Sequence, residues 1–145
     1  IMYEIIKPFH SYLALALLAV LIIGIMIVLM SKLSKKPFAA SHLKIALIAL
    51  ISTHIQLLLG LVLYFISPLG FSNLSGAVMK DSFGRLQAVE HPLTMIIAVV
   101  LITIGYSKAK KALGTDKAYN AVLIYYSIGL ILILSRLPWQ VWMKG

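Results

Sequence analysis

Four histidines carry most of the chemistry that this chain of 145 residues could perform: His10, His42, His54 and His91. The chain has no cysteine, which excludes thiolate metal sites, iron–sulfur clusters, c-type haem attachment and cysteine nucleophiles. Its four acidic residues all lie outside the middle of the long apolar segments, which argues against a carboxylate-based proton pathway or ion pump. The chemistry that remains is that of imidazole, as a ligand to a metal or cofactor or as a hydrogen-bonding group.

His10 and His91 have the most informative placement of the four. Each lies at the start of a long apolar segment, and the first and third segments run in the same direction in an up-down-up-down bundle. Two such helices lie diagonally across the core, which sets the two imidazoles at similar depth. Neutral imidazoles in that arrangement can hold one flat macrocycle between them, as the axial ligands of a b-type haem. We therefore predict His10 and His91 as metal ligands within a cofactor site.

Arg136 lies in the last turn of the fourth apolar segment, on the same side of the membrane as His10 and His91. Three interpretations stay open for it. Its side chain could snorkel to the headgroups, pair with Glu90, or bind the propionates of a haem, because a guanidinium holds carboxylates in a bidentate fork. Glu90 and Pro92 are also what the first turn of a helix favours, but that leaves His91 between them unexplained.

His54 lies near the middle of the second apolar segment, where a polar side chain is costly. One interpretation is a neutral imidazole bonded across to a serine or threonine of a neighbouring helix. The other is a metal or quinone ligand. We place it about ten helical residues deeper than His10 and His91, on the order of 15 Å, so it would not share their haem. We expect His42 to be an interfacial residue without an assigned role.

The elements that position these residues are four apolar segments that each match the thickness of a bilayer core. The chain is 61% hydrophobic and 12% charged, whereas a soluble domain averages about a quarter charged residues. Lipid leaves the backbone no other partners, so each segment is predicted to be a helix. The prediction is an all-α, multi-pass integral membrane bundle in one domain, 1–145. Its spans are about 10–31, 42–66, 88–107 and 118–138, with Pro8 just before or in the first helical turn.

The segment 67–87 is the only long connection. Val78, Met79, Phe83 and Leu86 recur at roughly helical spacing. This spacing favours either a short amphipathic helix on the membrane surface or a packed cap over the bundle.

Charge placement predicts the orientation. The net charge is +9, and eight of the thirteen basic residues lie in or beside the two short connections: Lys32, Lys35, Lys36, Lys44, Lys108, Lys110, Lys111 and Lys117. The positive-inside rule places these connections in the cytoplasm and both termini on the other side of a bacterial inner membrane. The basic charge is then a topology signal and an attraction to anionic lipid, and no nucleic-acid partner is predicted.

The chain resembles a group of small four-helix bacterial membrane proteins, described as cytochrome b-like and associated with Bacteroidetes-type bacteria. The resemblance rests on His10-Ser11, on the segment 54–60 (HIQLLLG), on Glu90-His91-Pro92-Leu93 and on Arg136-Leu137-Pro138-Trp139. The segment 54–60 is also similar to part of one half of haem A synthase. Pro92 departs from that family's motif, so the synthase activity is not implied. The resemblance implies haem binding, with His10, His54 and His91 as candidate ligands and Arg136 as a propionate partner.

Two functions follow as hypotheses from different classes. The first is a membrane-bound b-type haem protein that transfers electrons within or beside a respiratory complex, with a quinone as a further possible cofactor. The second is an accessory subunit of a larger respiratory or secretion complex, without its own cofactor. Under both hypotheses we expect an electron carrier or a subunit and not a stand-alone enzyme. The expected partners are membrane lipid and other membrane subunits, and no soluble substrate is evident. A transporter is disfavoured because no inverted repeat or broken mid-span helix is visible.

Overall fold

A computed structural model describes residues 1–142, and all regular secondary structure in that range is helical. Four long helices form the body of the molecule: α1 (Met2–Leu33), α2 (Ala40–Ile66), α4 (His91–Lys111) and α5 (Asp116–Ser135). The short helix α3 (Ser82–Arg85) and a π-helical turn, η3 (Leu86–Glu90), continue directly into α4. The predicted all-α, four-helix architecture is confirmed.

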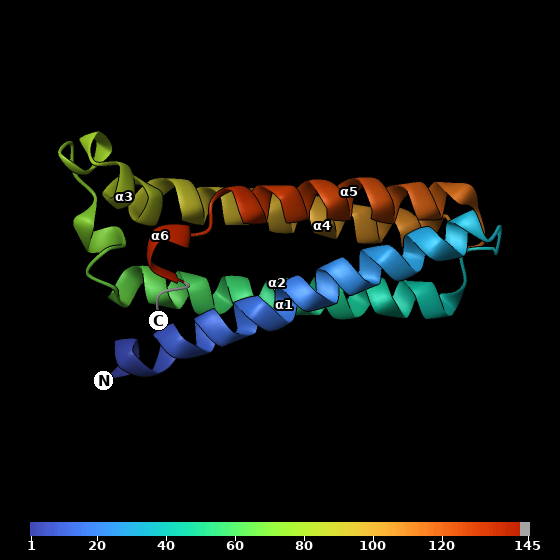
Figure 1. The fold of residues 1–145 in the computed structure, drawn as a ribbon, viewed down its shortest axis with the longest axis horizontal. Helices are drawn as coiled ribbons and strands as arrows, with labels where there is room; N and C mark the ends of the chain where they lie inside the picture. Colours follow the sequence, from blue (N-terminus) through green and yellow to red (C-terminus); the bar gives the residue numbers. More distant parts are fainter. Residues whose placement is uncertain (143–145) are drawn as a thin grey trace.

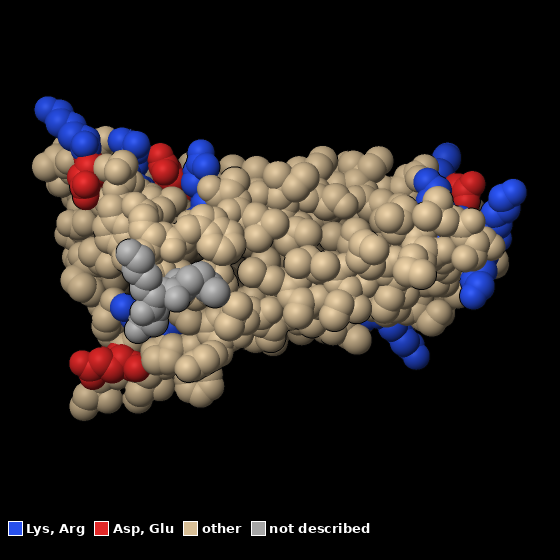
Figure 2. Space-filling view, in the orientation of Figure 1, with Lys and Arg blue, Asp and Glu red and all other residues tan. Residues whose placement is uncertain are grey.

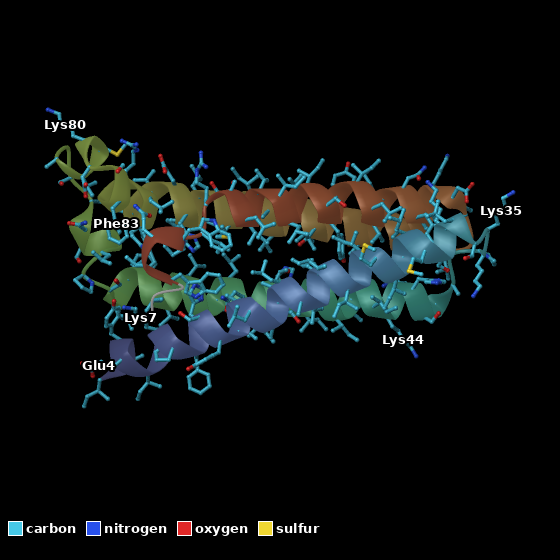
Figure 3. All side chains as sticks on the ribbon, in the orientation of Figure 1. Glu4, Lys7, Lys35, Lys44, Lys80 and Phe83 are labelled. Atoms are coloured by element: carbon cyan, nitrogen blue, oxygen red, sulfur yellow. The ribbon has the colours of Figure 1, made fainter. Side chains whose placement is uncertain are left out.

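The surface of the bundle divides into an uncharged middle and two charged ends. All four long helices are long and apolar enough to cross a membrane, and charged side chains gather at the two ends of the face seen in Figure 2. Lys35 and Lys44 lie toward one end, whereas Glu4, Lys7 and Lys80 lie at the other (Figure 3). We call the first the lysine end, formed by the α1–α2 and α4–α5 connections, and the second the histidine end. This is the architecture of a multi-pass membrane protein.

The four long helices form a closed ring of neighbours. α1 packs against α2 and α5, and α4 packs against the same two helices, so α1 and α4 lie diagonally, as predicted for the first and third spans. Figure 1 shows α1 inclined to the other three. Leu21, Val28 and Ile102 are buried in the shared core. Tyr126 of α5 reaches across the other diagonal and donates to the main-chain oxygen of Ala46 in α2 at 2.7 Å.

The α4–α5 contact is the most extensive in the bundle, and glycines remove side chains that would separate the two helices. A Cβ atom at residue 105 would lie 2.6 Å from the Cβ atom of Tyr125, and one at residue 129 would lie 2.7 Å from Ile102 Cγ1. Both distances are below van der Waals contact. α4 and α5 therefore form one tightly packed pair.

The first helix begins earlier than the sequence predicts. α1 starts at Met2 rather than near residue 10, and Pro8 lies inside it. A proline at residue 8 removes only the N–H that would bond the carbonyl of Glu4, in the exposed first turn where water or headgroups can replace it. The prediction that Pro8 marks the start of the helix is therefore wrong. As a result His10 lies eight residues inside α1.

The connection between α2 and α4 is folded but is not one amphipathic helix. It contains two 3₁₀ turns, η1 (Phe71–Asn73) and η2 (Val78–Lys80), and then α3. The carboxylate of Asp81 accepts a hydrogen bond from Gly84 N–H at 2.9 Å and so caps α3. The continuous helical segment formed by α3, η3 and α4 thus begins at Ser82, six residues before the predicted 88. Val78 is buried, which agrees better with the packed-cap alternative.

The chain after α5 turns back at the histidine end. It ends, within the described residues, in the single turn α6 (Trp139–Trp142). Trp139 Nε1 donates to the carbonyl of Leu134 at 2.9 Å, and α6 lies at the same end of the molecule as the N-terminus (Figure 1).

Candidate functional site at the histidine end

The structure brings His10 and His91 together. The two rings extend from the diagonal helices α1 and α4, and their centroids lie 6.4 Å apart with the ring planes at 88°. The pairing of these histidines at similar depth, predicted from their places in the first and third segments, agrees with this geometry.

The orientation of His91 is set by the end of α5. Its Nδ1 atom lies 2.7 Å from the main-chain oxygen of Arg136, the C-cap residue of that helix. A helix leaves its last carbonyls without intrahelical partners, so this oxygen is free to accept. A carbonyl can only accept a hydrogen bond, so Nδ1 carries the proton and Nε2 of the neutral ring keeps its lone pair. Metal-ligating histidines are commonly held this way by a backbone carbonyl.

The backbone in front of His91 is also unusual. The π-helical turn η3 closes with the N–H of His91 bonded to the carbonyl of Leu86, and such turns occur frequently at functional sites. Pro92 has no N–H for the carbonyl of Ala88, four residues earlier. Tyr64 of α2 fills the gap, because its hydroxyl donates to Ala88 at 2.8 Å. The irregular turn that presents His91 is therefore fixed by a side chain from a neighbouring helix.

His10 is held against α2 by two residues that the sequence analysis did not identify. Gln56 Nε2 donates to the main-chain oxygen of His10 at 2.7 Å. A Cβ atom at residue 60 would lie 3.1 Å from His10 Cε1, so Gly60 provides the space that the ring occupies. Two buried atoms at this contact, His10 Nδ1 and Gln56 Oε1, have no hydrogen-bond partner among residues 1–142. The spacing of Gln56 and Gly60 by four residues, which places them on one face of α2, was the available signal.

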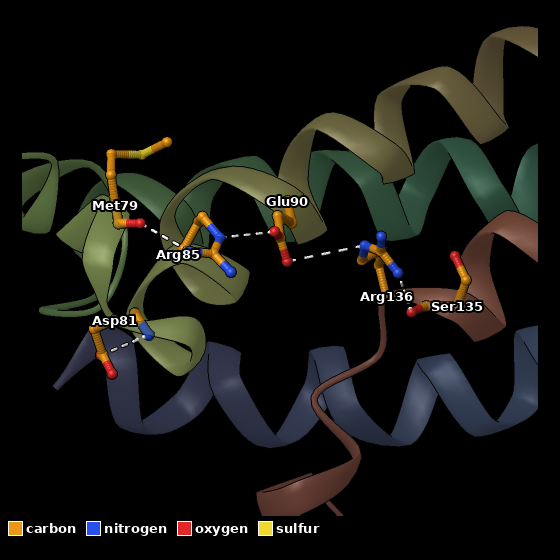
Figure 4. Close-up of polar contacts among 7 residues, drawn as sticks. Met79, Asp81, Arg85, Glu90, Ser135 and Arg136 are labelled. Atoms are coloured by element: carbon orange, nitrogen blue, oxygen red, sulfur yellow. Dashed lines mark hydrogen bonds and ion pairs between the residues drawn. The ribbon is translucent and has the colours of Figure 1, made fainter.

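A chain of charged groups lies beside the histidine pair (Figure 4). Glu90 accepts from Arg85 Nε at 2.9 Å and lies 3.9 Å from Arg136 Nε. Arg85 also donates to the carbonyl of Met79 and Arg136 to that of Ser135. The pairing of Arg136 with Glu90, one of three interpretations left open, is present, whereas Arg85 was missed. Two guanidiniums share one carboxylate, so the cluster has an excess positive charge for another anion.

His54 lies apart from this cluster. Its side chain is exposed on the outer surface of α2, and Nδ1 is 2.9 Å from the carbonyl of Leu50 in the same helix. Of the two interpretations left open for His54, the hydrogen bond to a serine or threonine of another helix is not present. The offset in depth is smaller than predicted, because the His10 ring lies against Gly60, six residues along α2 from His54, and not about ten. His54 is separated from the pair mainly because its side chain points away from the core of the bundle.

His42 has a structural role that the sequence analysis left unassigned. Its Nδ1 accepts from the N–H of Ala39 at 2.9 Å, and its Nε2 lies 2.7 Å from Ser31 Oγ of α1. Tyr119 of α5 also donates to Ser31 Oγ, at 3.0 Å. The histidine therefore caps α2 and joins three helices at the lysine end.

Comparison of the chain with protein-family models, with curated proteins and with solved structures finds no match. Within the described residues no three His, Cys, Asp or Glu side chains are grouped closely enough to hold a bare metal ion. The arrangement that remains is a two-imidazole site with a cationic neighbour. Such a site could supply two imidazole nitrogens to a cofactor and a counter-charge for carboxylates.

Proposed function

We propose that this chain is a membrane-bound b-type haem protein that transfers electrons, and that His10 and His91 bind the haem iron. The observation that carries the proposal is the meeting of these two rings, at 6.4 Å, from diagonal helices of an apolar bundle. Bis-histidine ligation requires two neutral imidazoles presented from separate elements. The resemblance to cytochrome b-like four-helix proteins points in the same direction.

The residues at the site fit such a cofactor in three respects. His91 has its Nδ1 proton engaged by Arg136, which leaves Nε2 able to bind a metal. His10 has a buried nitrogen without a protein partner among the described residues. Gly60 keeps α2 free of a side chain where the His10 ring lies.

A bound haem supplies reversible one-electron transfer, and the protein residues tune and hold it. The main-chain oxygen of Arg136 fixes the tautomer of His91 and raises its basicity. Arg85 and Arg136 are both partly exposed and share Glu90, so their remaining N–H donors are the natural partners of the propionates. Both imidazoles are half-buried between the helices.

We further propose that the lysine end faces the cytoplasm and the histidine end the opposite side of a bacterial inner membrane. The accumulation of lysines in the α1–α2 and α4–α5 connections supports this orientation. Electrons would then pass between a quinol or protein donor and an acceptor outside the cytoplasm, within or beside a respiratory complex.

One observation favours the alternative, an accessory subunit without a cofactor. The bond from His91 to Arg136 closes the end of α5, which is a sufficient structural reason for a histidine at this position. In that case His91 is a helix cap and the bundle serves to contact other membrane subunits.

An absorbance spectrum of the purified, dithionite-reduced protein from a haem-replete host tests the proposal. We expect a b-type α-band that is lost in His10→Ala and kept in the matched control His54→Ala, because His54 faces away from the pair. A colourless preparation that co-purifies with a fixed set of partners would establish the accessory-subunit alternative instead.

A further inference from the structure

The lysine end contains a groove that the proposed function does not use. The groove has a volume of about 680 Å³ and lies between the last turns of α1, the α1–α2 connection and the start of α2. Ile27 and Met30 form its apolar side, and both are exposed. Ser34, Lys36 and Ser41 form its polar side. An apolar wall toward the middle of the span and polar groups toward the helix ends match the two halves of a phospholipid.

The walls of the groove are rigid. His42 and Ser31, one from each side, are bonded at 2.7 Å. Phe38 is buried and packs edge to face against Tyr119 with ring centroids 5.1 Å apart, and its carbonyl accepts from Gly114 N–H of the other short connection at 2.9 Å. The connection is thus fixed to α2, α5 and the α4–α5 connection. A ligand would enter a preformed site without paying to order a loop.

The turn that ends α1 is tight. Lys35 has a φ of +59°, a left-handed conformation that favours glycine over lysine. The N–H of Lys36 bonds back to the carbonyl of Ser31 at 3.2 Å. This reversal places Lys36 and Pro37 at the rim of the groove.

The charged side chains of the groove-forming half of the chain, from the middle of α1 to the end of α2, are all basic. The chain has no acidic residue between Glu4 and Asp81, and that stretch includes both helices that form the groove. The first turn of α2 likewise has no acidic side chain to offset its dipole. An anion is therefore the complementary occupant, whereas a zwitterionic group would bring a second positive charge to a cationic site.

We propose that this groove binds one anionic phospholipid. Its phosphate contacts Lys36 and the hydroxyls of Ser34 and Ser41, and the beginning of an acyl chain lies along Ile27 and Met30. Basic pockets on the cytoplasmic side of membrane proteins bind lipid headgroups in this way. The inference does not depend on haem, because the groove and the histidine pair lie at opposite ends of the bundle.

Native mass spectrometry of the full chain in detergent, titrated with phosphatidylglycerol or phosphatidylcholine of the same acyl chains, tests the proposal. We expect one tightly bound phosphatidylglycerol and weaker phosphatidylcholine. The variant Lys36→Gln/Ser41→Ala should bind phosphatidylglycerol about five- to tenfold more weakly. The control Lys110→Gln/Ser107→Ala removes the same charge and hydroxyl from exposed positions at the same end, and its affinity should change less than about twofold.

Three results would overturn the proposal. Equal losses in the two variants would mean that the lysines attract lipid without a site. Equal affinity for both lipids would exclude recognition of an anionic headgroup. Displacement of the lipid by millimolar inorganic phosphate would mean a site for the free ion. Because Lys36 is exposed and Lys36→Gln alone leaves the Ser31–His42 bond intact, this single variant repeats the test if the double variant folds poorly.

Discussion

The Nδ1 atom of His91 lies 2.7 Å from the main-chain oxygen of Arg136, and this one contact does two things. It gives a partner to a carbonyl at the end of α5, where Pro138 interrupts the helical pattern. It also fixes which nitrogen of His91 is free. The same bond therefore caps α5 and orients His91 as a ligand, and substitutions of His91 can separate these two roles.

The first prediction separates the cap from the ligand. His91→Ala removes the partner of the Arg136 carbonyl, an exposed hydrogen bond, and should lower the free energy of unfolding by about 0.5–1.5 kcal/mol. His91→Asn keeps an amide N–H close to the position of Nδ1, so we expect most of that stability to return. Neither variant should show the b-type spectrum. Thermal unfolding and the reduced spectrum are measured on the same samples, and a b-type spectrum in the Asn variant would show that His91 is not a ligand.

The second prediction concerns the contact between Gly60 and His10. A methyl group at residue 60 would lie 3.1 Å from His10 Cε1, so Gly60→Ala must displace the ring by a few tenths of an ångström. We expect about tenfold weaker haem retention with little change in helix content, since the residue supports a ligand without binding the iron. Haem transfer to apomyoglobin measures the retention. Gly76→Ala is the matched control, because a Cβ atom there meets nothing within 4 Å, and an equal effect of both variants would contradict the prediction.

The sequence predicts the four helices well because length and apolarity in lipid leave few alternatives. It predicts the ends of those helices less well. The first residues of the chain include Glu4, Lys7 and Pro8, a composition typical of the polar segment before a span. They nevertheless belong to α1, whose 32 residues exceed the length that the bilayer core requires. Similarly, Asp81 begins the third helix early because its side chain caps Gly84. Neither a side-chain cap nor a helix that extends beyond the bilayer core changes the hydropathy of the sequence enough to be predicted from it.

The candidate site was predictable only in part, for a related reason. Helix order and direction placed His10 near His91, but the rotation and vertical register of α1 against α2 depend on how the α1–α2 connection packs. Without that register, Gln56 and Gly60 could not be assigned to His10, and His54 was set too deep. The exposure of His54 on the lipid side is equally a matter of rotation about the α2 axis.

A third prediction tests the orientation of the bundle. The chain has no cysteine, so single cysteines can be introduced without removing others. Lys35→Cys and Ser75→Cys place them in the α1–α2 connection and in the long connection at the opposite end, both at exposed positions. If lysines face the cytoplasm, a membrane-impermeant maleimide should label Ser75→Cys in intact cells. Lys35→Cys should react only after permeabilisation, and the reverse pattern would invert the topology.

The final prediction concerns the α4–α5 contact at Gly105. A Cβ atom at residue 105 would lie 2.6 Å from Tyr125 Cβ and 3.1 Å from the carbonyl of Ala121. Both neighbours are fixed close to the backbone, so the helices must separate, and Gly105→Ala should cost about 1–3 kcal/mol despite the better helix propensity of alanine. Gly24→Ala meets only the Cγ2 methyl group of Ile45, at 3.2 Å, and should cost less than Gly105→Ala. Thermal unfolding in detergent compares the two, and a Gly105→Ala protein as stable as the wild type would mean that α4 and α5 are not held at this distance.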